Sequence, residues 1–235
     1  MSGFVLPTPL PTANGNGNGA HPRPSLDIDV DVESLSAEES IAWALEQFGA
    51  ELRIAVSFQK TSSVIVDMVH RINPDARFFY VDTELLFPET YATRDELAAR
   101  YGIEFERIVN GSEPWSLDRD GCCAEHKVKL MHKALDQTGC WVSGIRRVDS
   151  ETRADAAKFG WDERFGLWKL NPLVDWDEKQ VWNYIQDRRV PYNALHDQGY
   201  PSIGCMPCTT VALEGAGERA GRWAGTDRTE CGIHG

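Results

Sequence analysis

Cysteines are the residues of this chain with the clearest capacity for chemistry. Cys231 lies in the segment Glu-Cys-Gly-Ile-His, close to the end of the sequence, and His234 follows three positions later. A thiol among basic side chains reacts as a thiolate, so this segment predicts a nucleophile. Four further thiols occur as an adjacent pair and a Cys-x-x-Cys pair: Cys122, Cys123, Cys205 and Cys208.

Two pairs of thiols are a common ligand set for a metal ion or an iron–sulfur cluster. The alternative is that they are buried and unreactive. Neighbouring residues of a helix point about 100° apart, however, so Cys122 and Cys123 would not both enter one core. Zinc sites usually separate paired ligands by two or more residues, whereas each ligand of a cluster binds a different iron. The spacing favours a cluster, and we expect Cys140, in an apolar run, to be a core strand residue.

Basic residues near these thiols are notable because the chain carries a formal net charge of −12. Arginine binds phosphate and sulfate groups through paired hydrogen bonds. Any one of these residues alone is explained by a solvated surface, but their positions at predicted loop ends favour a pocket for an anion. Such a pocket would lower the pKa of Cys231. The residues are Lys127, Lys129, Arg146, Arg147, Arg153, Arg219 and Arg222.

The segment Ser57-Phe-Gln-Lys-Thr-Ser-Ser63 follows a predicted strand and precedes a predicted helix. Backbone N–H groups at a helix N-terminus bind anions, and Lys60 and the nearby hydroxyls would add to that binding. The segment lacks the glycines of the Gly-x-x-x-x-Gly-Lys-Ser/Thr phosphate loop. Taken alone it is better explained as simple helix capping.

Strand-like and helix-like segments alternate along the chain. This pattern predicts an α/β fold with a mainly parallel, twisted, Rossmann-like sheet and helices on both faces. In such sheets ligands bind beyond the carboxyl ends of the strands. Ser36 with Glu39, and Asp175 with Glu178, have the spacing of helix capping boxes. We expect strands at 52–58, 78–81, 104–109 and 140–145, and helices at 34–48, 62–72, 88–101, 125–137 and 175–188.

Residues 26–235 are expected to form a single domain, with a mobile tail from about residue 210 that carries Cys231. Residues 1–25 are rich in Pro, Gly and Asn, a composition typical of disorder. The chain lacks the run of ~20 apolar residues that spans a membrane. The acidic charge argues against nucleic-acid binding, and the few cysteines favour a reduced, cytoplasmic compartment over a disulfide scaffold. The sequence leaves open whether the chain forms a homo-oligomer.

Six motifs occur between about Arg53 and Gly235: Asp82-Thr-x-x-Leu-Phe-Pro-Glu-Thr-Tyr91, Cys122-Cys-x-x-x-Lys-Val128, Gly144-Ile-Arg-Arg147, Gly204-Cys-x-Pro-Cys-Thr209, Glu218-Arg-Ala-Gly-Arg-Trp223 and Glu230-Cys-Gly-Ile-His234. With these motifs the sequence resembles the assimilatory sulfonucleotide reductases. Within that family, members acting on the 3′-phosphorylated nucleotide typically lack the two cysteine pairs, so the resemblance implies adenylyl sulfate (adenosine 5′-phosphosulfate) as substrate and a [4Fe–4S] cluster on the pairs.

The resemblance implies that Cys231 attacks the sulfur of the phosphosulfate and that AMP leaves. An S-sulfocysteine remains, from which thioredoxin or a glutaredoxin-like dithiol releases sulfite. The cluster would act structurally and electrostatically. Residues implied to offset the charge of the transferred group are Lys127, Arg219, Arg222 and His234. The implied nucleotide contacts are Ser57, Phe58, Gln59, Lys60, Ser62, Thr83, Gly144, Arg146 and Arg153.

Three positions depart from the family pattern. His126 stands where Arg is expected, Leu130 where Pro is frequent, and Glu84 where Gly is frequent. Apart from a reductase of the 3′-phosphorylated nucleotide, two interpretations of other kinds compete. An ATP-using PP-loop thiolation enzyme would need a Ser-Gly-Gly-x-Asp-Ser loop, which residues 57–62 lack. A metal-binding module without catalysis would not need Cys231 and the arginines near it.

Overall fold

The computed structural model describes residues 25–26, 28–111, 126–213, 215, 217–224, 228 and 230–234. The predicted N-terminal tail lies outside this part of the chain, apart from Ser25. Cys122 and Cys123 also lie outside it, so the expected ligand pair that they form stays a prediction.

Six strands form one sheet in the order β3-β2-β1-β4-β6-β5. Neighbouring strands are parallel except β5 and β6, which are antiparallel. The mainly parallel sheet expected from the sequence is therefore confirmed. The strands are β1 (Leu52–Ala55), β2 (Arg77–Val81), β3 (Glu106–Ile108), β4 (Cys140–Val142), β5 (Phe159–Asp162) and β6 (Leu167–Leu170).

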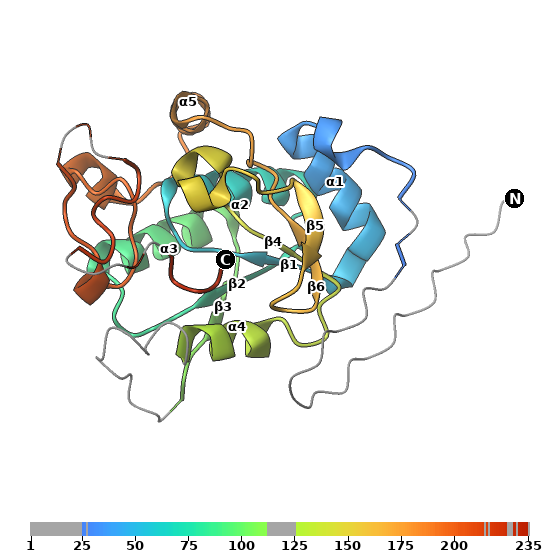
Figure 1. Cartoon of the computed structure of the whole chain (residues 1–235), viewed down its shortest axis with the longest axis horizontal. Coiled ribbons are helices and arrows are strands. Elements are labelled where there is room, and N and C mark those ends of the chain that lie inside the picture. The colour runs from blue at the N-terminus through green and yellow to red at the C-terminus, as the bar shows by residue number, and fades with distance from the viewer. Residues whose placement is uncertain are drawn as a thin grey trace, which may run out of the picture.

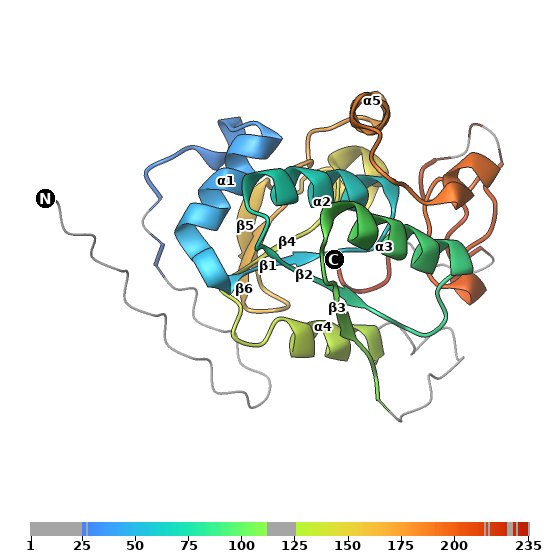
Figure 2. The ribbon, with the colours of Figure 1, turned by 180° about the vertical axis from the view of Figure 1, so that it is seen from behind.

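Helices cover both faces of the sheet, as the alternating pattern predicts. Figures 1 and 2 show α1, α2 and α3 over one face and α4 on the opposite face. A fifth helix, α5, packs against α2 on the outside of the first layer. The helices are α1 (Ala37–Phe48), α2 (Lys60–Ile72), α3 (Pro88–Tyr101), α4 (Val128–Ala134) and α5 (Glu178–Arg188).

Successive residues of a strand point to opposite faces, and this alternation divides the core into two layers. On β2, Phe78 packs in the layer under α1 and α2, whereas Phe79 packs in the layer with α4. On β4, Cys140 belongs to the first layer and Trp141 to the second. Cys140 is fully buried, and this burial raises the pKa of its thiol well above the ordinary value. The expectation of a core strand cysteine is confirmed.

One of the two expected capping boxes is present and the other is displaced. Ser36 accepts a hydrogen bond from the Glu39 N–H, while the Glu39 carboxylate accepts one from the Ser36 N–H at 2.8 Å. The expected cap at Asp175 is wrong, because α5 is capped by Asp177 with Gln180. The Asp175 carboxylate instead pairs with Arg147 and with Lys158.

The β5–β6 hairpin is an element that the sequence analysis did not identify. Its turn is closed by a hydrogen bond from the Gly166 N–H to the Asp162 carbonyl at 2.8 Å, and Gly166 has a φ of 67°. The hairpin extends the sheet beyond β4, because β6 pairs with β4 and β5 forms the edge. Within the described part of the chain, the helices are all too short or too polar to cross a membrane.

The departure at Glu84 has a local structural cost. Its φ of 57° lies in the left-handed region, which costs an L-residue roughly 1–2 kcal/mol and glycine nothing comparable. The turn is held by the Asp82 carboxylate, which accepts hydrogen bonds from the Glu84 N–H at 2.8 Å and the Tyr91 hydroxyl at 2.7 Å. The glycine that the resemblance implies at this position would fit the backbone of this turn without strain.

We predict that Glu84→Gly raises the free energy of unfolding by about 1 kcal/mol, because it removes the strain of the left-handed conformation. The exposed pair that Glu84 forms with Arg107 at 3.3 Å contributes little. Chemical denaturation measures the change. Glu104→Gly is the matched control, because Glu104 lies outside the left-handed region and its replacement should lower stability. A loss of stability in Glu84→Gly would contradict the explanation.

Candidate active site

A pocket lies beyond the carboxyl ends of β1, β2 and β4. The sheet order reverses here, because β1 pairs with β2 on one side and with β4 on the other. Connections that diverge from such a point leave a crevice in which ligands bind. All the substrate-site residues implied by the resemblance line this pocket except Thr83. The residues that line it are Ser57, Phe58, Gln59, Lys60, Ser62, Lys127, Gly144, Arg146, Arg153, Arg219, Arg222, Cys231 and His234.

The loop between β1 and α2 forms one wall. Phe58 is almost fully buried, and its φ of 56° places a non-glycine residue in the left-handed region. Its ring packs edge-on against Tyr80 and Phe105, with centroids 5.1 and 5.2 Å apart. These contacts offset the strained backbone, so that the loop can turn directly into α2 at Lys60.

His196 supports the same loop and was not identified from the sequence. Its Nδ1 lies 2.8 Å from the Tyr200 carbonyl oxygen, which only accepts, so Nδ1 carries the proton. Nε2 is then free to accept the Lys60 backbone N–H at 3.2 Å. Burial, followed by the charge of Lys60, lowers the pKa of His196 to about 4. The neutral ring therefore caps the first turn of α2.

Residues 202–204 close the pocket beside this loop. The Gln59 side-chain carbonyl accepts the Ile203 N–H at 2.8 Å. Arg222 donates to the Ile203 carbonyl at 3.4 Å and to the Ser202 hydroxyl at 3.3 Å. A Cβ atom on Gly204 would collide with the Arg222 guanidinium, so glycine at this position allows the arginine to approach.

Four cations surround the nucleophile candidate Cys231: Lys127, Arg153, Arg219 and Arg222. The preceding residue, Glu230, is held by two of them. Its carboxylate accepts two hydrogen bonds from Arg153, at 2.8 and 2.9 Å, and one from Arg219 at 2.9 Å. Burial, followed by the charge of Arg153, lowers the pKa of Arg219 to about 10. The sequence analysis did not consider Glu230, although an acid beside several arginines signals an ion pair.

The surroundings of Cys231 favour its thiolate. Burial raises the pKa of the thiol, but the charge of Lys127, the Ile233 backbone N–H and the charge of Arg222 act in the opposite direction. Together they lower the pKa below its ordinary value. The pocket therefore activates the thiol electrostatically, although two of the basic residues expected in it, Lys129 and Arg147, do not line it.

His234 lines the pocket but does not supply the positive charge that the resemblance implies. Its ring stacks on Trp141 with centroids 5.6 Å apart and an angle of 4° between the planes. Its Nδ1 lies 3.3 Å from the Lys169 ammonium, which only donates, so Nδ1 accepts and the ring is neutral. Burial and the surrounding cations lower the pKa of His234 well below its ordinary value. The histidine anchors the C-terminal segment, which the ribbon shows beside the central strands (Figure 1).

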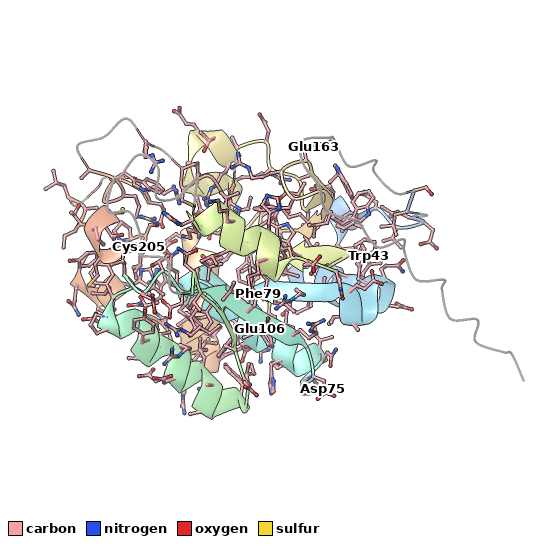
Figure 3. The ribbon with its side chains drawn as sticks, turned by 90° about the horizontal axis from the view of Figure 1, so that it is seen from below. Trp43, Asp75, Phe79, Glu106, Glu163 and Cys205 are labelled. Carbon is pink, nitrogen blue, oxygen red and sulfur yellow. The ribbon has the colours of Figure 1, made fainter. Side chains whose placement is uncertain are left out.

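Thr83 lies beside Cys205 and not among the residues that line the pocket. Its hydroxyl is 3.2 Å from the Cys205 sulfur, because the segment after β2 pairs with the segment around Cys205. The Met206 N–H donates to the Leu85 carbonyl at 2.8 Å. Figure 3 shows Cys205 at the end of the molecule opposite Trp43, with Phe79 of β2 between them.

Cys205 and Cys208 belong to one short 3₁₀ turn, in which the Cys208 N–H donates to the Cys205 carbonyl at 3.0 Å. Both side chains are partly exposed. Among the described residues no group of three or more His, Cys, Asp or Glu side chains has the geometry of a metal site. Two of the four expected ligands lie outside those residues. The two described thiols suit a cluster, since both belong to one turn and remain reachable.

The family model and two sequence relatives of this chain carry the names of phosphosulfate reductases. A family model described as the phosphoadenosine phosphosulfate reductase domain matches residues 51–211. The adenosine 5′-phosphosulfate reductase of Salinibacter ruber is 40% identical over 204 residues, covering 82% of this chain and 81% of that protein. The phosphoadenosine 5′-phosphosulfate reductase of Gloeobacter violaceus is 38% identical over 216 residues, covering 86% and 90%.

Solved structures agree with these matches. The phosphoadenylyl-sulfate reductase of Candida auris, in a phosphate complex, aligns with a TM-score of 0.68 and 29% identity, covering 77% of this chain and 93% of that one. The FMN adenylyltransferase of Candida glabrata shares the fold alone, with a TM-score of 0.57 and 17% identity over 74% of this chain and 62% of that one. On the family model and these identities, the chain belongs to the phosphoadenosine phosphosulfate reductase family.

Proposed function

We propose that this chain reduces adenosine 5′-phosphosulfate to sulfite and AMP in sulfate assimilation. The observation that carries the proposal is the position of Cys231. Its thiol lies in the pocket that is also lined by the loop after β1 and by six cationic side chains. The same pocket thus offers a nucleophile with a lowered pKa and positive charge for an anionic substrate.

In the first step the Cys231 thiolate attacks the sulfur of the phosphosulfate. The sulfur–sulfur bond forms as the bond between sulfur and the bridging oxygen breaks, and AMP departs with that oxygen and the electron pair. The two reactants are both anionic, so the guanidinium groups of Arg153, Arg219 and Arg222 and the ammonium of Lys127 reduce their repulsion. The product on the enzyme is an S-sulfocysteine.

In the second step a dithiol such as thioredoxin attacks Cys231 and releases sulfite. The two electrons come from the dithiol, which ends as a disulfide once its second thiol resolves the mixed disulfide. A partner protein must reach Cys231, which is partly buried in the pocket. We propose that the segment carrying Glu230 and Cys231 swings out for this step, as a mobile tail would.

The preference for adenosine 5′-phosphosulfate rests on the two cysteine pairs and on the names of several relatives. The proteins of Salinibacter ruber and Geobacillus kaustophilus, at 40% and 39% identity, are both named adenosine 5′-phosphosulfate reductases. The decisive assay supplies both sulfonucleotides with thioredoxin and measures sulfite. Equal efficiency with the 3′-phosphorylated nucleotide would refute the preference.

We propose that Cys122, Cys123, Cys205 and Cys208 hold a [4Fe–4S] cluster. The Thr83 hydroxyl, 3.2 Å from the Cys205 sulfur, is placed to donate a hydrogen bond to a bound thiolate. Bound there, the cluster would supply structural support and local charge and not electrons for the substrate. Lys127, which follows Cys123 by four residues and lines the pocket, would link the cluster to the substrate.

We predict that Cys231→Ser abolishes sulfite release but leaves AMP binding nearly unchanged, because the hydroxyl is a far weaker nucleophile. The wild-type protein, given adenosine 5′-phosphosulfate without a dithiol, should gain the mass of one SO₃ group on Cys231. Peptide mass spectrometry locates the adduct. Turnover by the variant, or active enzyme without an adduct, would argue against the nucleophile assigned here.

We predict that Lys127→Gln raises the pH at which Cys231 reacts with iodoacetamide, because Lys127 is the main charge that lowers the pKa of this thiol. In the wild-type protein the reaction should reach half of its maximum rate at a lower pH than for an ordinary thiol. Adducts are followed at Cys231 by mass spectrometry. Lys129→Gln, an exposed change two residues later on α4, should leave the dependence of the reaction rate on pH unchanged.

We predict about four iron and four sulfide per chain in protein purified without oxygen. Cys205→Ser should lose most of both, because it removes one of four ligands. Cys140→Ser is the comparison, since that thiol is buried in the core on β4 and is not expected to bind the cluster. One zinc per chain and a colourless protein would rule out the cluster.

A further inference from the structure

Four charged side chains form a cluster at the start of α2, which we term the charged quartet: Lys60, Arg146, Glu178 and Glu218. The Lys60 ammonium lies 2.6 Å from Glu178 and 3.0 Å from Glu218. Arg146 Nη2 lies 3.0 Å from Glu178 and 3.6 Å from Glu218. The side chains of Lys60 and Arg146 are only 5% and 1% exposed, so their charges are weakly screened by solvent.

The quartet makes the two ends of the pocket electrostatically different. Near Cys231, the four cations Lys127, Arg153, Arg219 and Arg222 outnumber the carboxylate of Glu230, with which Arg153 and Arg219 pair. At the quartet two cations face two carboxylates, and Asp149 lies between the two ends, 2.9 Å from Arg146 and 3.1 Å from Arg153. Among the described residues at these two ends, positive charge exceeds negative charge only around Cys231.

The nucleophile fixes the direction in which a sulfonucleotide enters. The sulfur must meet Cys231, so the phosphosulfate occupies the cationic end. The nucleoside then extends along the remaining lining, which includes Ser57, Gly144, Arg146 and Glu218. Arg146 Nη1 is buried and has no hydrogen-bond partner within the described protein, although Arg146 lines the pocket. A buried donor of this kind indicates that a polar atom of the ligand belongs beside it.

Glu218 is the member of the quartet whose function is otherwise unexplained. It begins the segment Glu218-Arg-Ala-Gly-Arg-Trp223, in which Arg219 and Arg222 already have roles near Cys231. It lines the pocket, whereas Glu178 on α5 supports Lys60 from behind without lining it. A carboxylate on a nucleotide pocket repels additional negative charge on the ligand but not a neutral hydroxyl.

We propose that Glu218 is a specificity-determining residue that disfavours nucleotides carrying a 3′-phosphate, a proposal that rests on the proposed function of this pocket. Its carboxylate neutralises Lys60 and presents negative charge to the nucleoside end. A ribose 3′-hydroxyl meets no repulsion there. A 3′-phosphate meets a carboxylate in a poorly screened site, next to a lysine whose charge is already satisfied.

The experiment uses two product-like ligands that do not react, AMP and adenosine 3′,5′-bisphosphate. Calorimetry gives both dissociation constants for the wild-type protein and for Glu218→Gln at one salt concentration. The wild-type protein should prefer AMP. Removing the carboxylate should reduce that preference about tenfold, which corresponds to roughly 1.4 kcal/mol. The ratio of kcat/KM for the two sulfonucleotides should move in the same direction.

Two further variants make the result specific. Glu218→Asp keeps the charge and should retain most of the preference, whereas Glu96→Gln, an exposed change on α3, should leave it unchanged. Thermal unfolding checks that Glu218→Gln is folded, which is expected because Glu178 still pairs with Lys60. If Glu218→Gln does not fold, Glu218→Asp decides: loss of preference despite the retained charge overturns the proposal.

An unchanged binding ratio in folded Glu218→Gln overturns the role of Glu218 while leaving the proposed reaction intact. Failure of the proposed reaction can also be told apart from failure of the proposal for Glu218. If the wild-type protein binds AMP but does not form sulfite, the proposed reaction fails, and the two binding constants still decide whether Glu218 discriminates against the 3′-phosphate.

Discussion

Negative charge on both reactants is the physical constraint on which this site depends. A thiolate and a phosphosulfate repel each other, and the repulsion is stronger in a pocket that excludes water. The cations around Cys231 offset it, and they lower the pKa of the thiol against the effect of burial. At the other end of the pocket, Glu178 and Glu218 pair with Lys60 and Arg146 in the charged quartet, because buried cations without partners would be costly.

The C-terminal segment is held in position by contacts on two sides of the pocket. Glu230 is held by Arg153 and Arg219, while Ile233 packs in the core layer beside α4. His234 stacks on Trp141 of β4 and remains neutral, so it adds an apolar anchor without adding charge. Two different kinds of contact, ionic on one side and aromatic on the other, thus position the thiol between them. Ion pairs of this type can exchange with an incoming anion, whereas the aromatic stacking cannot.

Backbone strain is found near the pocket and next to the segment that carries Cys205. Phe58 and Glu84 both adopt left-handed φ values, one directly after β1 and the other after β2. Aromatic packing stabilises the first, and the Asp82 carboxylate stabilises the second. Such conformations persist when the surroundings over-determine them, and they cluster at functional sites. Neither would be recognised from residue type, since Phe and Glu both disfavour the left-handed region.

Local patterns in the sequence predicted the parallel sheet, the helices on both faces and the capping box at Ser36, because the alternation of strand and helix segments and the spacing of a cap are visible among neighbours along the chain. The same holds for the burial of Cys140 within an apolar run. The tertiary structure alone decided which charges meet. Asp175 pairs with Arg147 and not with the start of α5, Glu230 with Arg153, and Glu218 with Lys60. His196 and His234 are neutral for the same reason: burial and contacts between residues far apart in sequence, which no local pattern encodes, set their protonation.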